Sequence, residues 1–381
     1  MKAVVVGGGV AGAASAIALR RIGAEVMVYE AYEDPAGQVG SFLSLAANGL
    51  RGLAALGCLP EVQAAGFAVE RQRMWSARGK LLGDVPRNRR ASDPLMSVTL
   101  RRGSLVSALR SACLRTGAKI VTGERVAAAD IGHLRTTADL VVGADGIWSV
   151  TRRFLDPGAP EPRYAGMYTV SGMSDGGGAR PGAFNMVFGR AGAFIYLPAP
   201  DGSVWWSAQV AQPRQPDLAA IGLDDVRALF GDEAQAGPIL RAARGAVSTT
   251  LNHVLDPVRR RQDGRVVAIG DAAHPVGAGQ GASMAIEDAV VLARELHRCA
   301  SVADGLASFD ALRVKRVGQM AKAATANRDA KTAGPLVARL RELIMPVVFP
   351  RAYPRATGWL YDYDLGTLPT GEEGPNSREV A

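Results

Sequence analysis

The sequence of 381 residues contains few of the side chains that build disulfide scaffolds or metal centres. It has four histidines and three cysteines, Cys58, Cys113 and Cys299. The cysteines are odd in number, far apart and outside any metal-ligand spacing, so they indicate neither a disulfide framework nor a metal site. We therefore expect no bound metal, and we expect the protein in the reducing cytoplasm.

Long hydrophobic runs are also missing. No apolar stretch approaches the roughly 20 residues that are needed to span a bilayer. The first residues, MKAVVVGGGVAGAASA, have the positive start and the apolar run of a signal peptide, but glycines interrupt that run. Residues 336–349 could form an amphipathic helix, for which docking on the protein's own body is the simpler interpretation. We expect no stable insertion into a membrane.

Positive charge is in excess, but it is dispersed. The net charge is +8 and the isoelectric point is about 9.7. Because the basic residues are mostly arginines spread along the chain, we expect no nucleic-acid partner. The hydrophobic share of 48% and the charged share of 21% are typical of a folded globular protein, and the length favours two domains.

The N-terminus has the pattern of a βαβ unit. Residues 2–6 and 24–30 have strand patterns, and residues 10–22 between them have an alanine-rich helical pattern. The later runs KIVTG, DLVVGADG and RVVAIGDAAH have the composition of buried parallel strands. Residues 161–262 instead contain short aromatic runs broken by glycine and proline, which predict an inserted antiparallel sheet.

A glycine fingerprint, GGGVAG, joins the first strand to the first helix. Gly7 would permit the tight turn, Gly9 the close approach of a pyrophosphate, and Gly12 the close packing of helix on strand. The helix N-terminus favours phosphate charge, and Glu30 at the end of the second strand can accept hydrogen bonds from ribose hydroxyls. The motif predicts a dinucleotide site but leaves NAD, NADP and FAD open.

Two further fingerprints follow, DLVVGADGIWSVTRR at 139–153 and GRVVAIGDAAHPVGAGQGASMAIEDAVVLA at 264–293. Three such motifs in this order resemble the single-component flavin monooxygenases, the family of para-hydroxybenzoate hydroxylase and salicylate hydroxylase. Arg102, which begins an Arg-x-x-Leu helix start, and the WLYDYD ending near Trp359 extend the resemblance over almost the whole chain.

The resemblance implies an α/β fold, in which a Rossmann-type FAD-binding domain carries an inserted, mostly antiparallel β-sheet substrate domain and C-terminal helices. The expected boundaries are 1–70, 97–160 and 263–330 for the discontinuous FAD-binding domain, 71–96 and 161–262 for the substrate domain, and 331–381 for the C-terminal helical segment.

The resemblance also implies which residues bind FAD. The first fingerprint and Glu30 would hold the ADP half, Arg102 would lie near the phosphates or the ribityl chain, and Asp271 would bind the ribityl hydroxyls. Asp145 would support the cofactor site. The helix N-terminus near Gly281 would face the pyrimidine end of the flavin, where the reduced ring carries negative charge. The expected set is Gly7, Gly9, Val10, Ala11, Gly12, Glu30, Arg102, Asp145, Asp271, Gly279, Gln280, Gly281 and Ala282.

The implied function is that of an enzyme in which the cofactor carries the chemistry. NADH or NADPH would reduce FAD, oxygen would add at flavin C4a, and the hydroperoxide would hydroxylate or epoxidise a small aromatic or polycyclic substrate. A catalytic side chain is not assigned, although His274 and Tyr196 are candidates. The partners would be the substrate and O2, and the protein a monomer or homodimer. Candidates for the substrate pocket, each with plain packing as the alternative, are Tyr168, Phe184, Met186, Phe194, Tyr196 and Trp206.

Departures from the family keep other functions open. The loop between His274 and the GQG sequence is shorter than is usual in the family, which leaves room for a protein that retains FAD without turnover. A flavin dehydrogenase, reductase or halogenase could share the scaffold, but the Trp205-Trp206 pair lacks the Trp-x-Trp-x-x-Pro context of a flavin halogenase. A plain NAD-dependent dehydrogenase would need neither GADG nor GDAAH.

Overall fold

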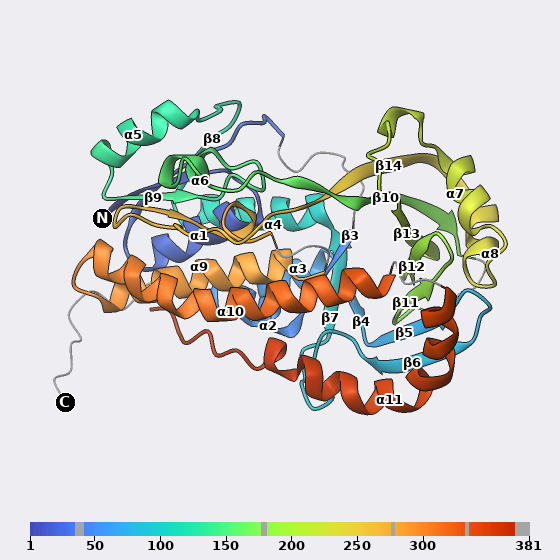
Figure 1. Ribbon diagram of the computed structural model, residues 1–381. Helices are drawn as coiled ribbons and strands as arrows, with labels where there is room; N and C mark the ends of the chain where they lie inside the picture. The colour runs from blue at the N-terminus through green and yellow to red at the C-terminus, as the bar shows by residue number, and fades with distance from the viewer. Residues whose placement is uncertain (35–41, 177–180, 276–278, 332–334, 370–381) are drawn as a thin grey trace.

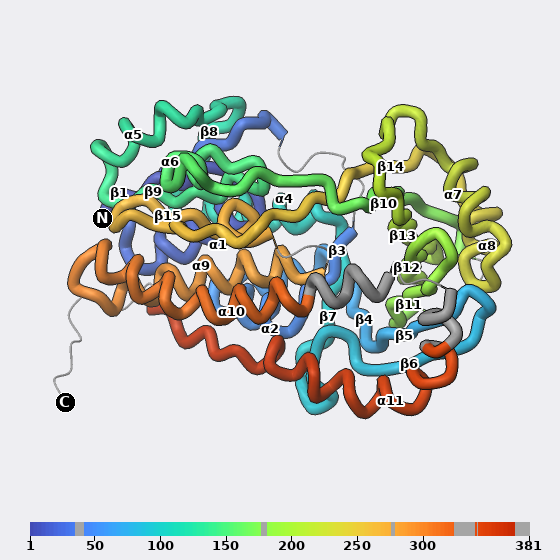
Figure 2. Tube along the Cα trace, viewed as in Figure 1, coloured from blue at the N-terminus to red at the C-terminus, as the bar shows by residue number. Residues whose placement is uncertain are grey.

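A parallel five-stranded sheet forms the centre of the FAD-binding half in the computed structural model, which describes residues 1–34, 42–176, 181–275, 279–331 and 335–369 (Figures 1 and 2). Its strand order is β15-β9-β1-β2-β8, and every pair in it is parallel. The strands are β1 (Lys2–Val6), β2 (Glu25–Tyr29), β8 (Lys119–Val121), β9 (Leu140–Gly143) and β15 (Val266–Ala268).

Helices bury both faces of this sheet, which explains why its strands are continuous apolar runs. One face packs against α1, α4 and α9, and the other against α5 and α6. The long helix α10 lies beside α9. The helix α5 lies in a stretch for which the sequence analysis predicted no element. The helices are α1 (Val10–Arg21), α4 (Arg102–Arg115), α5 (Ala128–Thr137), α6 (Val150–Leu155), α9 (Gly281–Arg298) and α10 (Val302–Lys331).

A seven-stranded sheet makes up the other half, in the order β14-β10-β13-β12-β11-β5-β6. All of its pairs are antiparallel except β5 with β11, which is parallel. One face of the sheet packs against α7 (Leu223–Phe230) and α8 (Ala236–Arg241). The strands are β5 (Arg71–Ser76), β6 (Leu81–Pro86), β10 (Arg163–Asp175), β11 (Ala183–Phe188), β12 (Gly192–Pro198), β13 (Ser203–Ala211) and β14 (Ala243–Val254).

A three-stranded sheet, in the order β3-β7-β4, lies between the two larger sheets in Figure 1. It leads directly into helix α2, which packs against α9. Its strands are β3 (Phe42–Leu45), β4 (Phe67–Val69) and β7 (Ser97–Arg101), and the helices that follow β3 are α2 (Ala47–Ala55) and α3 (Leu59–Ala64).

The C-terminal helix α11 (Pro335–Tyr361) runs along β6. A Cβ at Gly83 of β6 would overlap the ring of Phe349, so the glycine permits this close packing. In the segment 336–349, which was expected to dock on the protein, Phe349 makes this contact, whereas Leu340, Leu343, Ile344, Val347 and Val348 are exposed. No helix within the described part of the chain is long and apolar enough to cross a membrane.

The predicted fold class is confirmed, because the structure combines a Rossmann-type parallel sheet, a mostly antiparallel second sheet and C-terminal helices. The domain boundaries stay a prediction. They agree with the sheet topology, since β5 and β6, which come from residues 71–96, join the strands of residues 161–262 in one sheet.

Candidate functional site

The glycine turn after β1 meets the second motif at the edge of the parallel sheet. Gly7 has a φ of +100°, and a Cβ there would overlap the carbonyl oxygen of Ala144. A Cβ at Gly12 would overlap the carbonyl oxygen of Gly7. At Gly9, by contrast, a Cβ would have no heavy atom within 4 Å. Two glycines are therefore needed for packing, while the third leaves backbone open to a ligand at the N-terminus of α1.

Glu30 is held against this turn at the end of β2. Its carboxylate accepts hydrogen bonds from the Gly8 amide at 2.6 Å and from the Tyr32 amide at 3.0 Å. The side chain is buried. Each carboxylate oxygen has more than one acceptor position, so Glu30 can still accept a hydrogen bond from a bound hydroxyl.

Asp145 of the second motif uses its carboxylate to cap helix α6. It accepts hydrogen bonds from the Ser149 hydroxyl at 2.6 Å, the Val150 amide at 2.8 Å and the Thr151 amide at 3.0 Å. Such a cap holds the turn at the end of β9 in one conformation. The side chain of Asp145 therefore shapes the loop next to Gly7 and Ala144.

Arg152 joins the second motif to the third. Its side chain is buried, and its guanidinium donates to the Ala272 carbonyl oxygen at 3.0 Å and to the Ile147 carbonyl oxygen at 2.8 Å. Burial lowers the pKa of this arginine. The contact brings the GADG and GDAAH turns together, although more than a hundred residues separate them in the sequence.

The third motif places a carboxyl group beside the start of α9. The side chain of Asp271 is accessible to solvent, yet protein surrounds it so closely that burial raises its pKa, while His274 and Arg102 oppose that rise. A Cβ at Gly281 would lie 3.5 Å from Asp271 Oδ1. Arg102, Asp271 and the first turn of α9 are thus brought together.

The N-terminus of α9 has no side-chain cap. Its N-cap residue, Gln280, carries a buried Oε1 for which the described residues offer no hydrogen-bond partner. Gly279 has a φ of +122° and open space where a Cβ would be. Free amides and the positive helix end fit a ligand with negative charge, such as reduced FAD, and the unpartnered amide oxygen can accept a hydrogen bond from a donor on that ligand. The predicted loop 276–278 lies outside the described residues.

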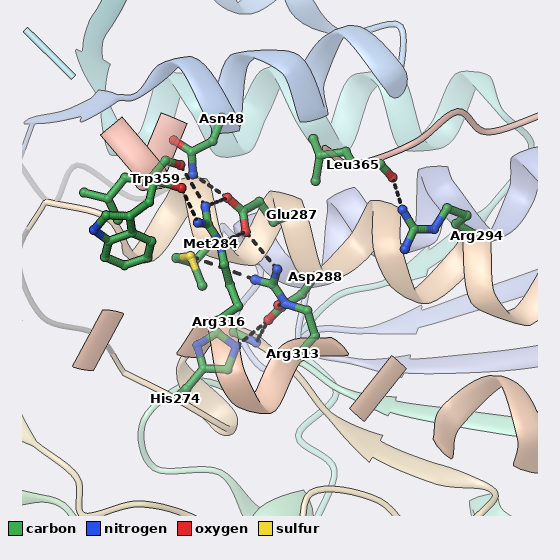
Figure 3. A network of polar contacts seen from close by, with 12 residues as sticks. Asn48, His274, Met284, Glu287, Asp288, Arg294, Arg313, Arg316, Trp359 and Leu365 are labelled. Atoms are coloured by element: carbon green, nitrogen blue, oxygen red, sulfur yellow. Dashed lines mark hydrogen bonds and ion pairs between the residues drawn. The ribbon is translucent and has the colours of Figure 1, made fainter. Parts of the chain in front are cut away.

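A buried network of charges fixes the third motif from behind (Figure 3). Asp288 of α9 accepts hydrogen bonds from the Gly270 amide at 2.9 Å and from Arg313 Nε at 2.7 Å. Glu287 accepts from Arg313 Nη1 at 2.8 Å and from Arg316 Nη2 at 2.6 Å. The four charged side chains are almost completely buried. Two acidic and two basic groups balance one another, as buried charges require.

This network also holds the C-terminal segment and helix α2. Arg316 donates to the carbonyl oxygens of Trp359 at 2.9 Å and Leu360 at 2.8 Å, and its guanidinium lies 4.4 Å from the ring centroid of Tyr363. Asn48 of α2 donates to Glu287 at 2.6 Å. The WLYDYD segment, which resembles the C-terminal ending of the family, is thus held against α10.

His274, a candidate catalytic residue, contacts the same network. Its Nε2 lies 2.6 Å from Asp288 Oδ2, and its buried Nδ1 has no hydrogen-bond partner within the described part of the chain. Burial opposes ionisation of Asp288, but the charges of His274 and Arg313 lower the pKa of this carboxyl to about 2. The ring is therefore oriented by Asp288 at the base of the third motif.

Four of the six candidates for the substrate pocket lie on the face of the seven-stranded sheet that packs against α7 and α8, here called the outer face. They share one apolar core with Phe230 of α7. The Tyr196 hydroxyl donates to Gln235 at 2.9 Å, and burial raises its pKa to about 12. Side chains fill this face, so these residues contribute packing there. They are Tyr168, Phe194, Tyr196 and Trp206.

The remaining two candidates, Phe184 and Met186, lie on the opposite face, here called the inner face. They pack with Phe42 and Phe67 of the three-stranded sheet. Trp205 also lies there, with its ring centroid 6.0 Å from that of Phe42 and 5.2 Å from that of Phe67. The inner face therefore meets the half of the molecule that carries the three motifs.

Several residues of this site were not named from the sequence. Glu287 and Asp288 belong to the quoted third motif, so the motif itself was a signal for them. No signal in the sequence pointed to Arg313 and Arg316, apart from their being two basic residues three positions apart on an expected helix. Trp205 was considered only as part of a halogenase motif, and strand alternation could have paired it with the face opposite Trp206.

Comparison with known proteins identifies the family. A family model described as FAD binding domain matches residues 1–324. The chain belongs to this family. The predicted cofactor, FAD, and the predicted class, a flavoprotein monooxygenase that uses NAD(P)H and oxygen, are confirmed.

Relatives of established name cover most of the chain. It is 31% identical to an aurachin C monooxygenase/isomerase of Stigmatella aurantiaca over 82% of this chain and 85% of the relative. It is 32% identical to a kynurenine 3-monooxygenase of Salinispora arenicola over 86% of this chain and 79% of the relative. A salicylate hydroxylase in a substrate complex has the same fold, with a TM-score of 0.77 at 20% identity, and the match covers 96% of each chain.

Proposed function

We propose that this monooxygenase hydroxylates or epoxidises a small aromatic or polycyclic compound bound between the three motifs and the inner face of the seven-stranded sheet. The observation that carries the proposal is an apolar, aromatic cluster beside the FAD-binding half, in which Phe184 and Met186 are buried and Trp205, Phe42 and Phe67 are partly buried. Such surfaces bind flat apolar rings and exclude water from them. NADH and NADPH both remain candidates as the reductant.

The chain's own residues would hold FAD in the following way. The amides around Gly9 and the N-terminus of α1 would bind the pyrophosphate, and Glu30 would accept hydrogen bonds from the ribose. Asp271 and Arg102 would contact the ribityl chain and the phosphates. The first amides of α9, near Gly281, would donate to the flavin ring. Bound FAD supplies the electron transfer and oxygen activation that no side chain here can supply.

His274 is proposed as a positioning residue. Its contact with Asp288 supports a role in holding the GDAAH turn against α9. The three free thiols support a cytoplasmic protein, and a monomer or a homodimer is proposed as the functional unit.

The test is to purify the protein, record its visible spectrum, and follow oxidation of NADH and NADPH and release of peroxide with a panel of phenols and polycyclic aromatics. We expect a yellow protein whose NAD(P)H oxidation is stimulated by a substrate and yields an oxygen-containing product. Bound FAD that neither nucleotide reduces would instead favour a protein that retains FAD without turnover.

A matched pair of variants tests the cofactor site. Gly9→Asp places a negative charge in the open space expected for the pyrophosphate, while aspartate suits the N-cap position that Gly9 occupies. We expect the variant to fold but to lose FAD. Gly318→Asp, at an exposed glycine of α10 with equally open surroundings, should retain FAD. Equal FAD content in both variants would contradict the proposed site.

A further inference from the structure

Two buried arginines, Arg87 and Arg152, form no ion pair with a carboxylate within the described part of the chain; Arg152 donates to two backbone carbonyl oxygens, and Arg87 has weaker compensation. Arg87 directly follows β6, and its side chain is 8% exposed. Its Nη1 donates to the amide oxygen of Gln72, and its Nε has no partner in the described part of the chain. Arginine is almost never buried without pairing, because removing a full charge from water is costly.

The surroundings of Arg87 offset only a small part of this cost. The guanidinium carbon lies 3.6 Å from the ring centroid of Phe184, a cation–π contact. Tyr353 and Tyr361 of α11 are near enough to influence its pKa, which burial lowers. Arginine nevertheless keeps its proton in proteins, so the positive charge persists. An amide, two phenols and an aromatic ring supply no negative charge to match it.

Arg87 lies where a substrate on the inner face would be. It follows Val85 by two residues, and the register pairs Val85 with Gln72 and Gln72 with Phe184, so these side chains share the inner face. The carbonyl oxygen of the next residue, Asn88, accepts from the Ala47 amide at 3.0 Å, which ties the segment to the start of α2.

Asn88 adds two features that are typical of ligand sites. Its φ is +53°, the one positive value at a non-glycine residue within the described ranges. Its buried Nδ2 is a second donor without a partner there. We assign these donors to a ligand other than the FAD phosphates, because β5 and β6 lie in a different half of the molecule from α1, the helix that the glycine turn precedes (Figure 1).

We propose that Arg87 is the anchor for an anionic oxygen of the substrate, and hence that the substrate of this monooxygenase is an aromatic acid, either a carboxylate or an ionised hydroxyl compound. The anion would accept hydrogen bonds from the guanidinium Nε and the Asn88 amide, while the substrate ring packs on Phe184 and Met186. This inference rests on the proposed function, since it assumes that the substrate binds on the inner face.

The test measures binding of two matched pairs of probes to the FAD-loaded protein by calorimetry. One pair is 2-naphthoate and 2-naphthamide, which differ in a carboxylate charge. The other is 4-hydroxycoumarin, ionised at neutral pH, and 4-methoxycoumarin. We expect wild type to bind at least one anion about tenfold more tightly than its neutral partner, the factor expected from one charge-assisted hydrogen bond. Which pair shows the preference identifies the kind of anion.

Variants assign the preference to Arg87. Arg87→Gln should abolish the preference for the anion and leave binding of the neutral probe unchanged, and Arg87→Lys should retain part of it because lysine keeps the charge but not the fork of donors. Arg73→Gln is the matched control, because Arg73 lies on the same strand as Gln72, faces the other way and pairs with Asp84. It should bind like wild type.

The proposal is overturned if wild type prefers neither anion at millimolar concentrations, or if Arg87→Gln keeps the preference. Its failure can be told from failure of the proposed function. A protein that binds FAD and oxidises NAD(P)H but shows no preference for the anions refutes only the role of Arg87. A protein without FAD refutes the proposed function, and calorimetry still reports anion binding.

Discussion

Buried arginines in two regions of this protein have opposite surroundings, and a third, Arg152, is held by two backbone carbonyl oxygens. Arg313 and Arg316 between α9 and α10 face Glu287 and Asp288, and all four are held by hydrogen bonds of 2.6 to 3.1 Å. Arg87 on the inner face has an amide and aromatic rings around it. A fully paired network needs no ligand and holds the fold together, whereas an unpaired charge is costly until an anion arrives. Arg313 and Arg316 are therefore structural, and Arg87 is the charge that we assign to binding.

The largest loss of stability is expected when a charge is removed from the paired network between α9 and α10. Glu287→Gln keeps the side-chain shape but removes a charge that Arg313 and Arg316 both contact. Leaving buried charge uncompensated should lower the free energy of unfolding by about 3–5 kcal/mol, measured by urea denaturation. Glu61→Gln is the control, because Glu61 forms an exposed pair with Arg115 and should change stability by about 1 kcal/mol or less. Similar losses in the two variants would contradict the role of burial.

A smaller loss of stability is expected when the pH is lowered. The pKa of Asp288 in the folded protein is about 2, below the ordinary value of 3.8. A carboxyl group whose pKa is lower in the folded than in the unfolded protein stabilises the folded state at pH values above the unfolded pKa. This contribution, about 2 kcal/mol, is lost as the pH falls from about 4 to about 2. Urea denaturation of wild type and Asp288→Asn across this range measures it. The variant should show the shallower decline, and parallel profiles would show that Asp288 is not responsible.

The smallest effect on stability is expected from a substitution of Arg87. This substitution is nevertheless the most direct test of the difference between paired and unpaired buried arginines. Arg87→Met removes the unpaired charge and keeps much of the side-chain volume, so the free energy of unfolding should stay equal or rise by about 1 kcal/mol. The same change at Arg313 should be strongly destabilising, because it leaves Asp288 and Glu287 with less compensation. Urea denaturation without added ligand compares the two. A loss at Arg87 as large as at Arg313 would mean that Arg87 is structural.

Local signals in the sequence were sufficient for the parallel sheet and its ligand turns. The runs KAVVV and DLVVGADG are apolar throughout because their strands are covered on both faces, and β1 and β9 are found there. Gly7 and Gly12 were predicted from spacing, and the overlaps that a Cβ would cause at both positions give the reason. The helix α4 begins at Arg102, as the Arg-x-x-Leu pattern predicted.

The same reasoning could not assign aromatic residues to the two faces of the seven-stranded sheet. Alternation implies that Trp205 and Trp206 point to opposite faces, but it does not say which face α7 and α8 cover. The helices lie on the side of Trp206, which is completely buried with Phe194 and Phe230. Residues proposed as one pocket from their aromatic character are thus divided between the two faces of the sheet.

The sequence by itself determined the family and the cofactor through the order of three motifs along the chain, and it determined the glycine turns because each turn depends on residues that are neighbours in the sequence. Only the tertiary structure decided which charges are paired. Glu287 meets Arg316 across 29 residues, and the guanidinium of Arg87 meets the Gln72 amide across 15, with no carboxylate beside it among the described residues. Charge compensation depends on distance in space and on burial, and neither is encoded in any local pattern of the sequence.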